Sequence, residues 1–168
     1  MLGGIKSGKS RFAESLATNT ELSVLYIATA SPSDAEMHQR IEHHKKSRPS
    51  HWQVIEEPHE PDRVIKKHSN AKTCVLVDCL TLWLTNLLLL EDDQILQRHK
   101  AELISSIAEA PGPVILVSNE TSMGIVPMGE LTRRFCDEAG LLHQELAGLC
   151  DNVVLMVAGL PQYLKGSN

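Results

Sequence analysis

The hydrophobic pattern of the chain alternates between short apolar runs and longer amphipathic segments. Residues 23–28, 74–79, 114–118 and 153–158 form apolar runs of five or six residues. Continuous runs of this length are typical of strands that are buried on both faces. Residues 10–17, 80–90, 93–110 and 130–150 have the spacing and length of helices. Strands that alternate with helices predict βαβ units and a mainly parallel sheet, hence an α/β fold.

Three weaker segments complete the pattern. Ser33 followed by Glu36 forms a capping box, which predicts a helix from residue 33 to about residue 46. Residues 52–57 alternate weakly and predict a short strand, and residues 62–68 predict a short helix. At 168 residues the chain is expected to form a single domain, residues 1–168.

Composition narrows the class of protein. The net charge of −5 and the pI near 5.9 argue against non-specific binding of nucleic acid. The four cysteines lack the spacing of a zinc site and lie in apolar or helical runs, so we expect reduced, buried thiols in a cytoplasmic protein. The start lacks the apolar core of a signal peptide, and the apolar run at 80–90 is too short for a membrane span.

The first ten residues carry the clearest chemical motif. They match G-x-x-x-x-G-K-[ST], a loop whose backbone N–H groups surround phosphate oxygens. Its members are Gly3, Gly4, Ile5, Lys6, Ser7, Gly8, Lys9 and Ser10. Lys9 is expected to reach the β- and γ-phosphates, and the Ser10 hydroxyl to bind Mg²⁺. Such a loop normally follows a buried strand, and only Met1 and Leu2 precede it here, so the first strand of the fold is expected to be missing.

A second motif lies at the end of a predicted strand. Asp78 follows Val75, Leu76 and Val77, which is the pattern of the acid that holds Mg²⁺ in nucleotide-binding proteins. Alone this signal is weak, because an acid at a strand end is more often a solvated surface residue. Together with a phosphate loop, the pattern favours the Mg²⁺-binding role. Because ligands bind at the carboxyl ends of the strands in such sheets, Asp78 and the segment Thr29–Ala30 are expected at one edge.

Histidines are concentrated between residues 38 and 59, where five of the eight lie. Arg40, His43 and Lys46 are spaced to share one helix face, whereas the adjacent His44 points about 100° away. A cationic face that carries a histidine suits phosphate binding, and neutral imidazole is a competent nucleophile towards phosphorus. The alternative is an ordinary solvated polar helix.

Other polar and apolar segments have open interpretations. Arg48 could bind a phosphate or merely cap the preceding helix. Ser118, Asn119 and Glu120 follow a strand and could contact a ligand, or could lie on the surface. Residues 123–127 are too apolar for a surface turn, so we expect them to pack against a neighbouring subunit or a large apolar ligand.

Several blocks together resemble one family. GGIKSGKS, YIATA, DAEMHQRIEHHKKSRPSHW, LVDCLTLWLTNLL, VSNETSMGIVP and DNVVLMVAGLP are similar to the bifunctional adenosylcobinamide kinase/adenosylcobinamide-phosphate guanylyltransferases of cobalamin synthesis. The resemblance spans nearly the whole chain. It implies a P-loop NTPase fold with a RecA-like sheet, a homotrimer, and two reactions: phosphorylation of adenosylcobinamide by ATP or GTP, then transfer of GMP from GTP to adenosylcobinamide phosphate.

The resemblance also assigns residues. The guanylylated histidine of the family falls on His43, the first of the adjacent pair. Nucleotide contacts fall on the whole loop Gly3 to Ser10 and on a further set of residues. That set is Ala28, Thr29, Ala30, Lys45, Lys46, Ser47, Arg48, Glu56 and Asp78. Mg²⁺ is expected on Ser10 and Asp78.

The chain departs from the family pattern at three places. Ile5-Lys6 replaces the usual Ala-Arg, which keeps a positive charge but loses a bidentate fork. Thr121-Ser122 replaces Val-Gly. The apparent loss of the first strand would leave the loop unsupported, so a truncated chain, an upstream start or an impaired protein is expected. Two alternative functions remain at this stage, a simple phosphate-loop kinase and a non-catalytic nucleotide-binding remnant.

Overall fold

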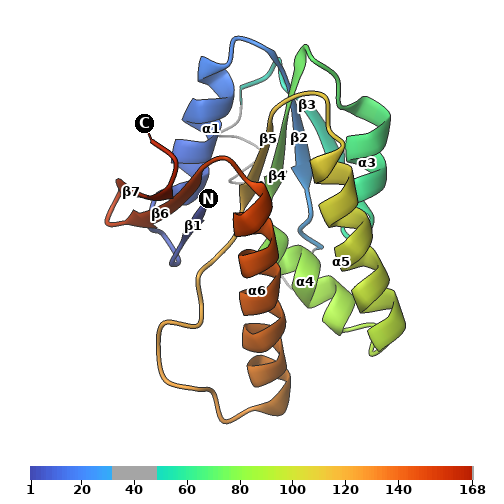
Figure 1. The fold of residues 1–168 in the computed structure, drawn as a ribbon, viewed down its shortest axis with the longest axis vertical. Helices are drawn as coiled ribbons and strands as arrows, with labels where there is room; N and C mark the ends of the chain where they lie inside the picture. Colours follow the sequence, from blue (N-terminus) through green and yellow to red (C-terminus); the bar gives the residue numbers. More distant parts are fainter. Residues whose placement is uncertain (32–48, 168) are drawn as a thin grey trace.

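The structure is a computed structural model that describes residues 1–31 and 49–167. Its strands and helices alternate along most of the chain (Figure 1). The strands are β1 (Leu2–Gly3), β2 (Ser23–Ala28), β3 (Gln53–Glu56), β4 (Thr73–Asp78), β5 (Val114–Val117), β6 (Val153–Val157) and β7 (Leu160–Lys165). The helices are α1 (Lys9–Asn19), α3 (Pro61–His68), α4 (Leu80–Leu88), α5 (Asp93–Ala108) and α6 (Glu130–Leu149). The helix predicted for 33–46 lies outside the described residues.

Four parallel strands form the main sheet in the order β3-β2-β4-β5. A second ladder has the order β1-β6-β7, with β1 parallel to β6 and β7 antiparallel to it. The α/β class and the mainly parallel sheet are therefore confirmed. Strand β7 was not predicted.

The expectation of a missing first strand was wrong. Leu2 and Gly3 form β1, paired in register with Leu155 and Met156 of β6. On the other side, the amino group of Met1 donates to Leu116 O, Ser118 N donates to Met1 O, and Glu120 N donates to Gly3 O, at 2.9 to 3.0 Å. These bonds link β1 to the end of β5, so the two ladders form one continuous sheet. Three residues suffice because neighbours on both sides satisfy their backbone groups.

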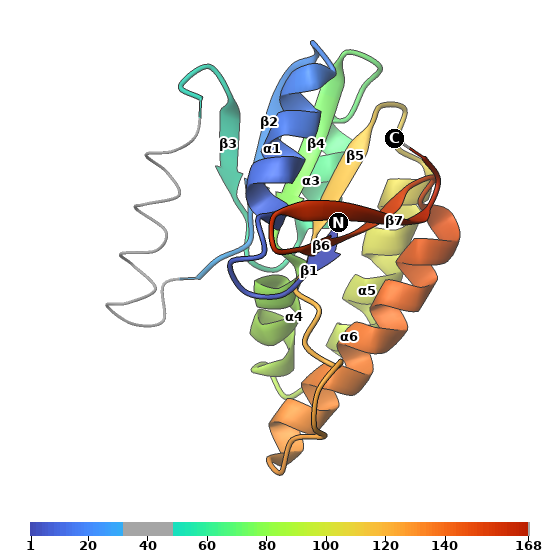
Figure 2. The ribbon, with the colours of Figure 1, turned by 90° about the vertical axis from the view of Figure 1, so that its left-hand side faces the viewer.

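Side chains of each buried strand divide between two cores on opposite faces of the sheet. In β2, Leu25 and Ile27 pack with α3, α4, α5 and α6, whereas Val24, Tyr26 and Ala28 pack with Ala13 and Ala17 of α1. Figure 2 shows α1 on one side of the sheet and α5 and α6 on the other. This alternation explains why the strands read as unbroken apolar runs.

The polar features of the fold differ in part from expectation. All four cysteines are unpaired, but only Cys74 is buried, while Cys79, Cys136 and Cys150 are half-buried. Among the described helices, none combines the length and the apolar character needed to cross a lipid bilayer.

Candidate functional site

The carboxyl ends of the central strands line up at one edge of the sheet. Ala28 is in register with Glu56 on one side and with Asp78 on the other, and Asp78 is in register with Val117. Strand β1 also ends at this edge, because Gly3 O accepts a hydrogen bond from Glu120 N just beyond β5. The structure therefore brings the phosphate loop, Ala28, Glu56 and Asp78 to one edge of the sheet.

The phosphate loop runs from β1 into the first turn of α1, as a phosphate-binding loop requires. Ser7 N donates to Gly4 O at 3.2 Å, which closes the turn, and Lys9 Nζ lies 3.3 Å from Gly4 O across the loop. Gly159, in the turn between β6 and β7, donates its N–H to Ser7 O at 2.9 Å. The β6–β7 hairpin thus supports the loop from outside.

Two glycines of the loop are required by its geometry. Gly3 has φ 154°, and a Cβ there would lie 2.6 Å from Ser7 Oγ and 2.8 Å from Met156 O. Gly8 has φ 95° and immediately precedes α1, where a Cβ would lie 3.3 Å from the Cα of Gly159. Both positions favour glycine because their φ is positive and because a Cβ would lie close to neighbouring atoms.

Asp78 lies on the α1 face of the sheet and is oriented by a tyrosine. Side chains two residues apart on a strand share a face, and Leu76 belongs to the core under α1. Tyr26, which is in register with Leu76, donates its hydroxyl to Oδ2 of Asp78 at 2.8 Å. Asp78 therefore faces the helix that begins at the phosphate loop. No motif in the sequence indicated this role for Tyr26.

Thr29 has a structural role at the same edge. Its hydroxyl donates to Cys79 O at 2.7 Å and accepts from Cys79 N at 2.9 Å. The amide of Asn86 on α4 donates to Thr29 O and to Pro58 O, at 2.9 and 3.0 Å. Thr29 is fully buried, so its side chain holds the segment after Asp78. Burial also raises the pKa of the Cys79 thiol to about 11, with a smaller contribution from Asp78.

The remaining expected nucleotide contacts divide into two groups. Ala28 is buried, Ala30 is half-buried and Glu56 is exposed at the strand ends. His43, Lys45, Lys46, Ser47 and Arg48, together with Arg40 and His44, lie outside the described residues. Their placement relative to the phosphate loop stays a prediction.

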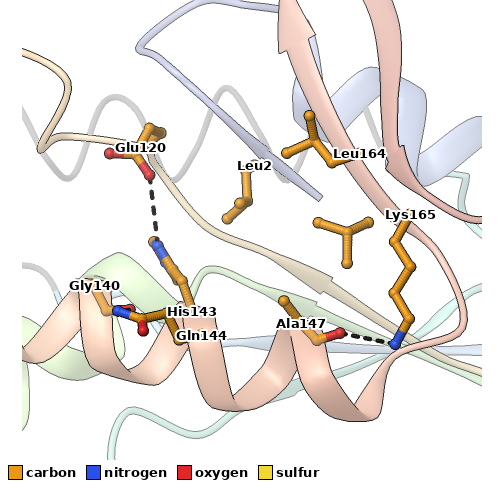
Figure 3. A pocket seen from close by; sticks show the side chains of 9 residues that line it. Leu2, Glu120, Gly140, His143, Gln144, Ala147, Leu164 and Lys165 are labelled. Carbon is orange, nitrogen blue, oxygen red and sulfur yellow. Dashed lines mark hydrogen bonds and ion pairs between the residues drawn. The ribbon is translucent and has the colours of Figure 1, made fainter.

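A cluster of polar side chains joins the end of β5 to α6, and its member on α6, His143, was not predicted from the sequence. His143 Nε2 lies 2.8 Å from Ser118 Oγ, and its Nδ1 faces Oε2 of Glu120 at 3.8 Å (Figure 3). Burial lowers the pKa of His143, against the opposing effect of Glu120. Burial also acts to raise the pKa of Glu120, but hydrogen bonds from Ser122 and the charge of His143 outweigh it, and the pKa lies below its ordinary value.

The loop that follows Glu120 is exposed in the part of the protein that the structure describes. Met123, Ile125 and Val126 are 74%, 98% and 73% exposed, so these three side chains are not covered by the residues that the structure describes. Exposure of three neighbouring apolar side chains is consistent with the expectation of a partner or ligand there.

Ser10 and Asp78 offer the hydroxyl and carboxylate oxygens that Mg²⁺ prefers, so the donor set fits that ion. A different group of possible metal ligands lies between α3 and α5, where one atom each of Asp62, His99 and Glu102 fall within 4.8 Å of one another. Asp62 is buried, and desolvation raises its pKa. This group packs in the core on the face opposite α1.

Comparison with known proteins identifies the family. Residues 1–164 match the family model described as cobinamide kinase / cobinamide phosphate guanyltransferase. The chain is 53% identical over 166 residues to the bifunctional adenosylcobalamin biosynthesis protein CobP of Pseudomonas aeruginosa, covering 99% of this chain and 96% of the relative. It is 39% identical over 176 residues to the bifunctional adenosylcobalamin biosynthesis protein CobU of Escherichia coli K12, covering 97% of each.

A solved structure supports the fold alone. A protein of Pyrococcus horikoshii OT3 superposes with a TM-score of 0.57 at 9% identity, covering 99% of this chain and 85% of that one. The two relatives found by sequence are 53% and 39% identical to this chain, whereas this structural neighbour is 9% identical. The chain therefore belongs to the cobinamide kinase / cobinamide phosphate guanyltransferase family and is a nucleotide-binding transferase of cobalamin biosynthesis.

Proposed function

We propose that this protein phosphorylates adenosylcobinamide with ATP or GTP and then converts the product to adenosylcobinamide-GDP. The observation that carries the proposal is the shared edge of the sheet, where the phosphate loop, Ala28, Glu56 and Asp78 come together. The description of the family names both a kinase and a guanyltransferase, which supports both reactions. The expectation of a remnant without its first strand loses its basis, because β1 is present.

In the first reaction, the acceptor hydroxyl oxygen attacks the γ-phosphorus, and the bond from that phosphorus to the β–γ bridging oxygen breaks. The nucleoside diphosphate leaves. Backbone N–H groups of the loop and Lys9 hold the triphosphate, and the positive end of α1 stabilises its charge. Ser10 and Asp78 would hold Mg²⁺, which neutralises charge on the phosphates when it is bound.

In the second reaction, a ring nitrogen of His43 attacks the α-phosphorus of GTP and pyrophosphate leaves. A phosphate oxygen of adenosylcobinamide phosphate then attacks the same phosphorus, the P–N bond breaks, and the histidine is regenerated. The covalent intermediate divides one difficult transfer into two easier ones. Lys45, Lys46, Ser47 and Arg48 are proposed to bind the nucleotide, and Glu56 to contact it from the end of β3.

Covalent labelling tests this assignment. Incubation with α-labelled GTP is expected to give a protein-bound label that is stable to alkali and labile to acid, and to release pyrophosphate. His43→Ala should abolish the label, while His44→Ala serves as the matched control because adjacent side chains on the helix predicted from the sequence would point about 100° apart. Label that persists in His43→Ala would contradict the role of His43. Phosphorylation without any label in the wild type would indicate a simple kinase.

We also propose that the protein is a cytoplasmic homotrimer, as the resemblance to the family implies. The exposed apolar side chains of Met123, Ile125 and Met128 support an assembly that covers them. Light scattering coupled to size-exclusion chromatography is expected to give three times the mass of 18.5 kDa. A monomer at micromolar concentration would contradict the trimer and leave the catalytic proposal untouched.

A further inference from the structure

A histidine and two carboxylates lie together between α3 and α5, in the core on the face of the sheet opposite α1. One side-chain atom each of Asp62, His99 and Glu102 lies within 4.8 Å of the other two. Nδ1 of His99 faces Oε2 of Glu102 at 3.7 Å. Asp62 and His99 are only 3% and 4% exposed, whereas the side chain of Glu102 is 41% exposed. The group is therefore closed towards the core and open to solvent on the side of Glu102.

Core packing fixes two of these side chains from both helices. Asp62 precedes the fully buried Ile65 by three residues on α3. His99 lies between the buried Leu96 and Leu103 on α5, three residues after the first and four before the second. Side chains three or four residues apart share a face of a helix, and these three apolar residues belong to one core. Asp62 and His99 are thus directed towards each other by well-packed helices.

The buried ring of His99 has a nitrogen that lacks a partner. Within residues 1–31 and 49–167, Nδ1 of His99 makes no hydrogen bond, although it is shielded from water. Nε2 lies 3.5 Å from a guanidinium nitrogen of Arg98, at the long limit of a hydrogen bond. An unpaired buried polar atom costs free energy. In a neutral ring, Nδ1 can instead use its lone pair to bind a metal ion.

The two carboxylates of the group act against each other. Desolvation raises the pKa of Asp62, and the charge of Glu102 raises it further, against a smaller opposing effect of Lys66. Ionising both acids in this place is unfavourable because one of them is buried. A divalent cation between them would remove the repulsion.

We propose that Asp62, His99 and Glu102 bind one Zn²⁺ ion, which links α3 to α5. Zn²⁺ accepts imidazole nitrogen and carboxylate oxygen, each at about 2.0–2.2 Å. Atoms 3.7 Å apart can both lie about 2.1 Å from one ion, with an angle of about 120° between the two bonds. The third atom lies within 4.8 Å, and small rotations of the carboxylates bring it to the spacing of about 3.4 Å that a tetrahedral site needs.

Burial of the ligand atoms suits an ion better than a water molecule or a substrate. Because a zinc ion lies only about 2.1 Å from its ligands, it fits between atoms that leave no room for water. The half-exposed Glu102 provides the entry side, where a water molecule can complete the fourth position. Mg²⁺ fits poorly, because it prefers six oxygen ligands in an octahedron. The site is separate from the proposed reactions, whose Mg²⁺ ligands Ser10 and Asp78 lie at the phosphate loop and on the α1 face.

Thermal unfolding of the full chain with Zn²⁺ and without nucleotide tests the site. Zn²⁺ at about 100 times its dissociation constant is expected to raise the Tm by about 5–10 °C, because the ion binds the folded chain. Mg²⁺ at the same concentration should give no comparable shift. Titration calorimetry should detect one Zn²⁺ site per chain that depends on Glu102.

Substitution of the half-exposed ligand is the sharpest variant, since Glu102→Gln keeps the size of the side chain. It is expected to weaken Zn²⁺ binding about 10-fold or more, because loss of an outer partner of a metal ligand alone costs about 10- to 100-fold. Glu145→Gln, which changes an exposed carboxylate on α6, is the matched control and should bind Zn²⁺ as the wild type does. His99→Gln should also lose the site, and Glu102→Gln keeps the test decisive if that buried variant does not fold.

The absorption spectrum of bound Co²⁺ gives an independent readout. Co²⁺ in place of Zn²⁺ should show visible d–d bands without a thiolate charge-transfer band, since the group contains no cysteine. The d–d bands should disappear in Glu102→Gln.

Three results would overturn the inference. Zn²⁺ could give no stabilisation even at millimolar concentration, which would leave His99 and Glu102 as an ordinary polar contact. The stabilisation could be equal in Glu102→Gln and the wild type, which would place the ion elsewhere in the chain. A thiolate band in the Co²⁺ spectrum would place it on a cysteine. None of these results bears on phosphorylation or GMP transfer, which are measured separately.

Discussion

The hydroxyl of Tyr26 donates a 2.8 Å hydrogen bond to Oδ2 of Asp78, across two neighbouring strands. Tyr26 is 1% exposed and its ring stacks on Trp52 with centroids 6.4 Å apart, so its position is fixed by packing. One oxygen of the carboxylate is thereby held, and the orientation of the other is determined. An acid that must hold Mg²⁺ gains from such prior orientation.

Removing this hydroxyl should weaken the proposed metal site. In Tyr26→Phe the Mg²⁺ concentration that gives half-maximal stabilisation by GTP is expected to rise about 10- to 100-fold, the range typical of losing a hydrogen-bond partner that orients a metal ligand. Thermal shift titrations with Mg²⁺ at fixed GTP would measure it. Tyr163→Phe, which removes a hydroxyl on β7, is the control. An unchanged Mg²⁺ midpoint in Tyr26→Phe would show that Asp78 needs no orientation.

Two neighbouring glycines should respond differently to alanine. Gly3→Ala places a Cβ 2.6 Å from Ser7 Oγ and 2.8 Å from Met156 O, at a φ of 154°. We expect a loss of roughly 2 kcal/mol or more in the free energy of unfolding. A Cβ at Gly4 meets nothing within 4 Å, so Gly4→Ala should lose less than about 1 kcal/mol. Urea denaturation would measure both, and equal losses would refute the steric explanation.

Thr29→Val tests the support of the segment after Asp78. The substitution keeps the shape of the side chain but removes both hydrogen bonds to the backbone of Cys79. We expect a loss of about 2–4 kcal/mol in unfolding free energy, because two buried backbone groups lose their partners. Thr18→Val is the control, since its exposed hydroxyl bonds only to Glu14 O in its own helix. A similarly small loss in both variants would mean that water can take over the two hydrogen bonds that the Thr29 hydroxyl makes to Cys79.

His143 should make the stability of the protein sensitive to acid. Burial lowers its pKa from the ordinary 6.5. Between the folded value and 6.5 the unfolded chain binds a proton that the folded chain does not, so stability falls as the pH decreases below about 6.5. Glu120 affects stability at lower pH, because its pKa is lowered from 4.5 in the folded state. The stability that it contributes is fully present above pH 4.5 and is lost as the pH falls through the lower pKa of the folded state.

Urea denaturation between pH 7 and pH 5 would separate this effect from the other histidines. The free energy of unfolding of His143→Gln should depend less on pH than that of the wild type. His68→Gln, at the end of α3, is the control and should keep the wild-type slope. If the two variants gave the same slope, burial of His143 would not be the cause.

The sequence predicted the elements whose signal is local. Strands β2, β4, β5 and β6 were predicted because each is an apolar run buried on both faces. Strand β7 was missed because its residues are largely exposed. It is reached through a two-residue turn, Ala158-Gly159, in which φ is 51° and 81°. Ala-Gly is not among the strong turn signals that a sequence offers.

The parts that depend on distant contacts could not be predicted. The strand character of Leu2 and Gly3 comes from β5 and β6, more than 110 residues away. Tyr26 is 52 residues from Asp78, and His143 is 25 residues from Ser118. Motifs placed the phosphate loop and Asp78 correctly at the sheet edge, because their chemistry is contained in a few consecutive residues.

The pairing of β1 with β6 has a consequence for the order in which the protein is made. Leu2 leaves the ribosome well before its partner Leu155, which is synthesised 153 residues later. The segment that precedes the phosphate loop therefore waits, unpaired on that side, through nearly the whole of translation. The support that the phosphate loop receives from β6 and from Gly159 is therefore completed as one of the last events of biosynthesis.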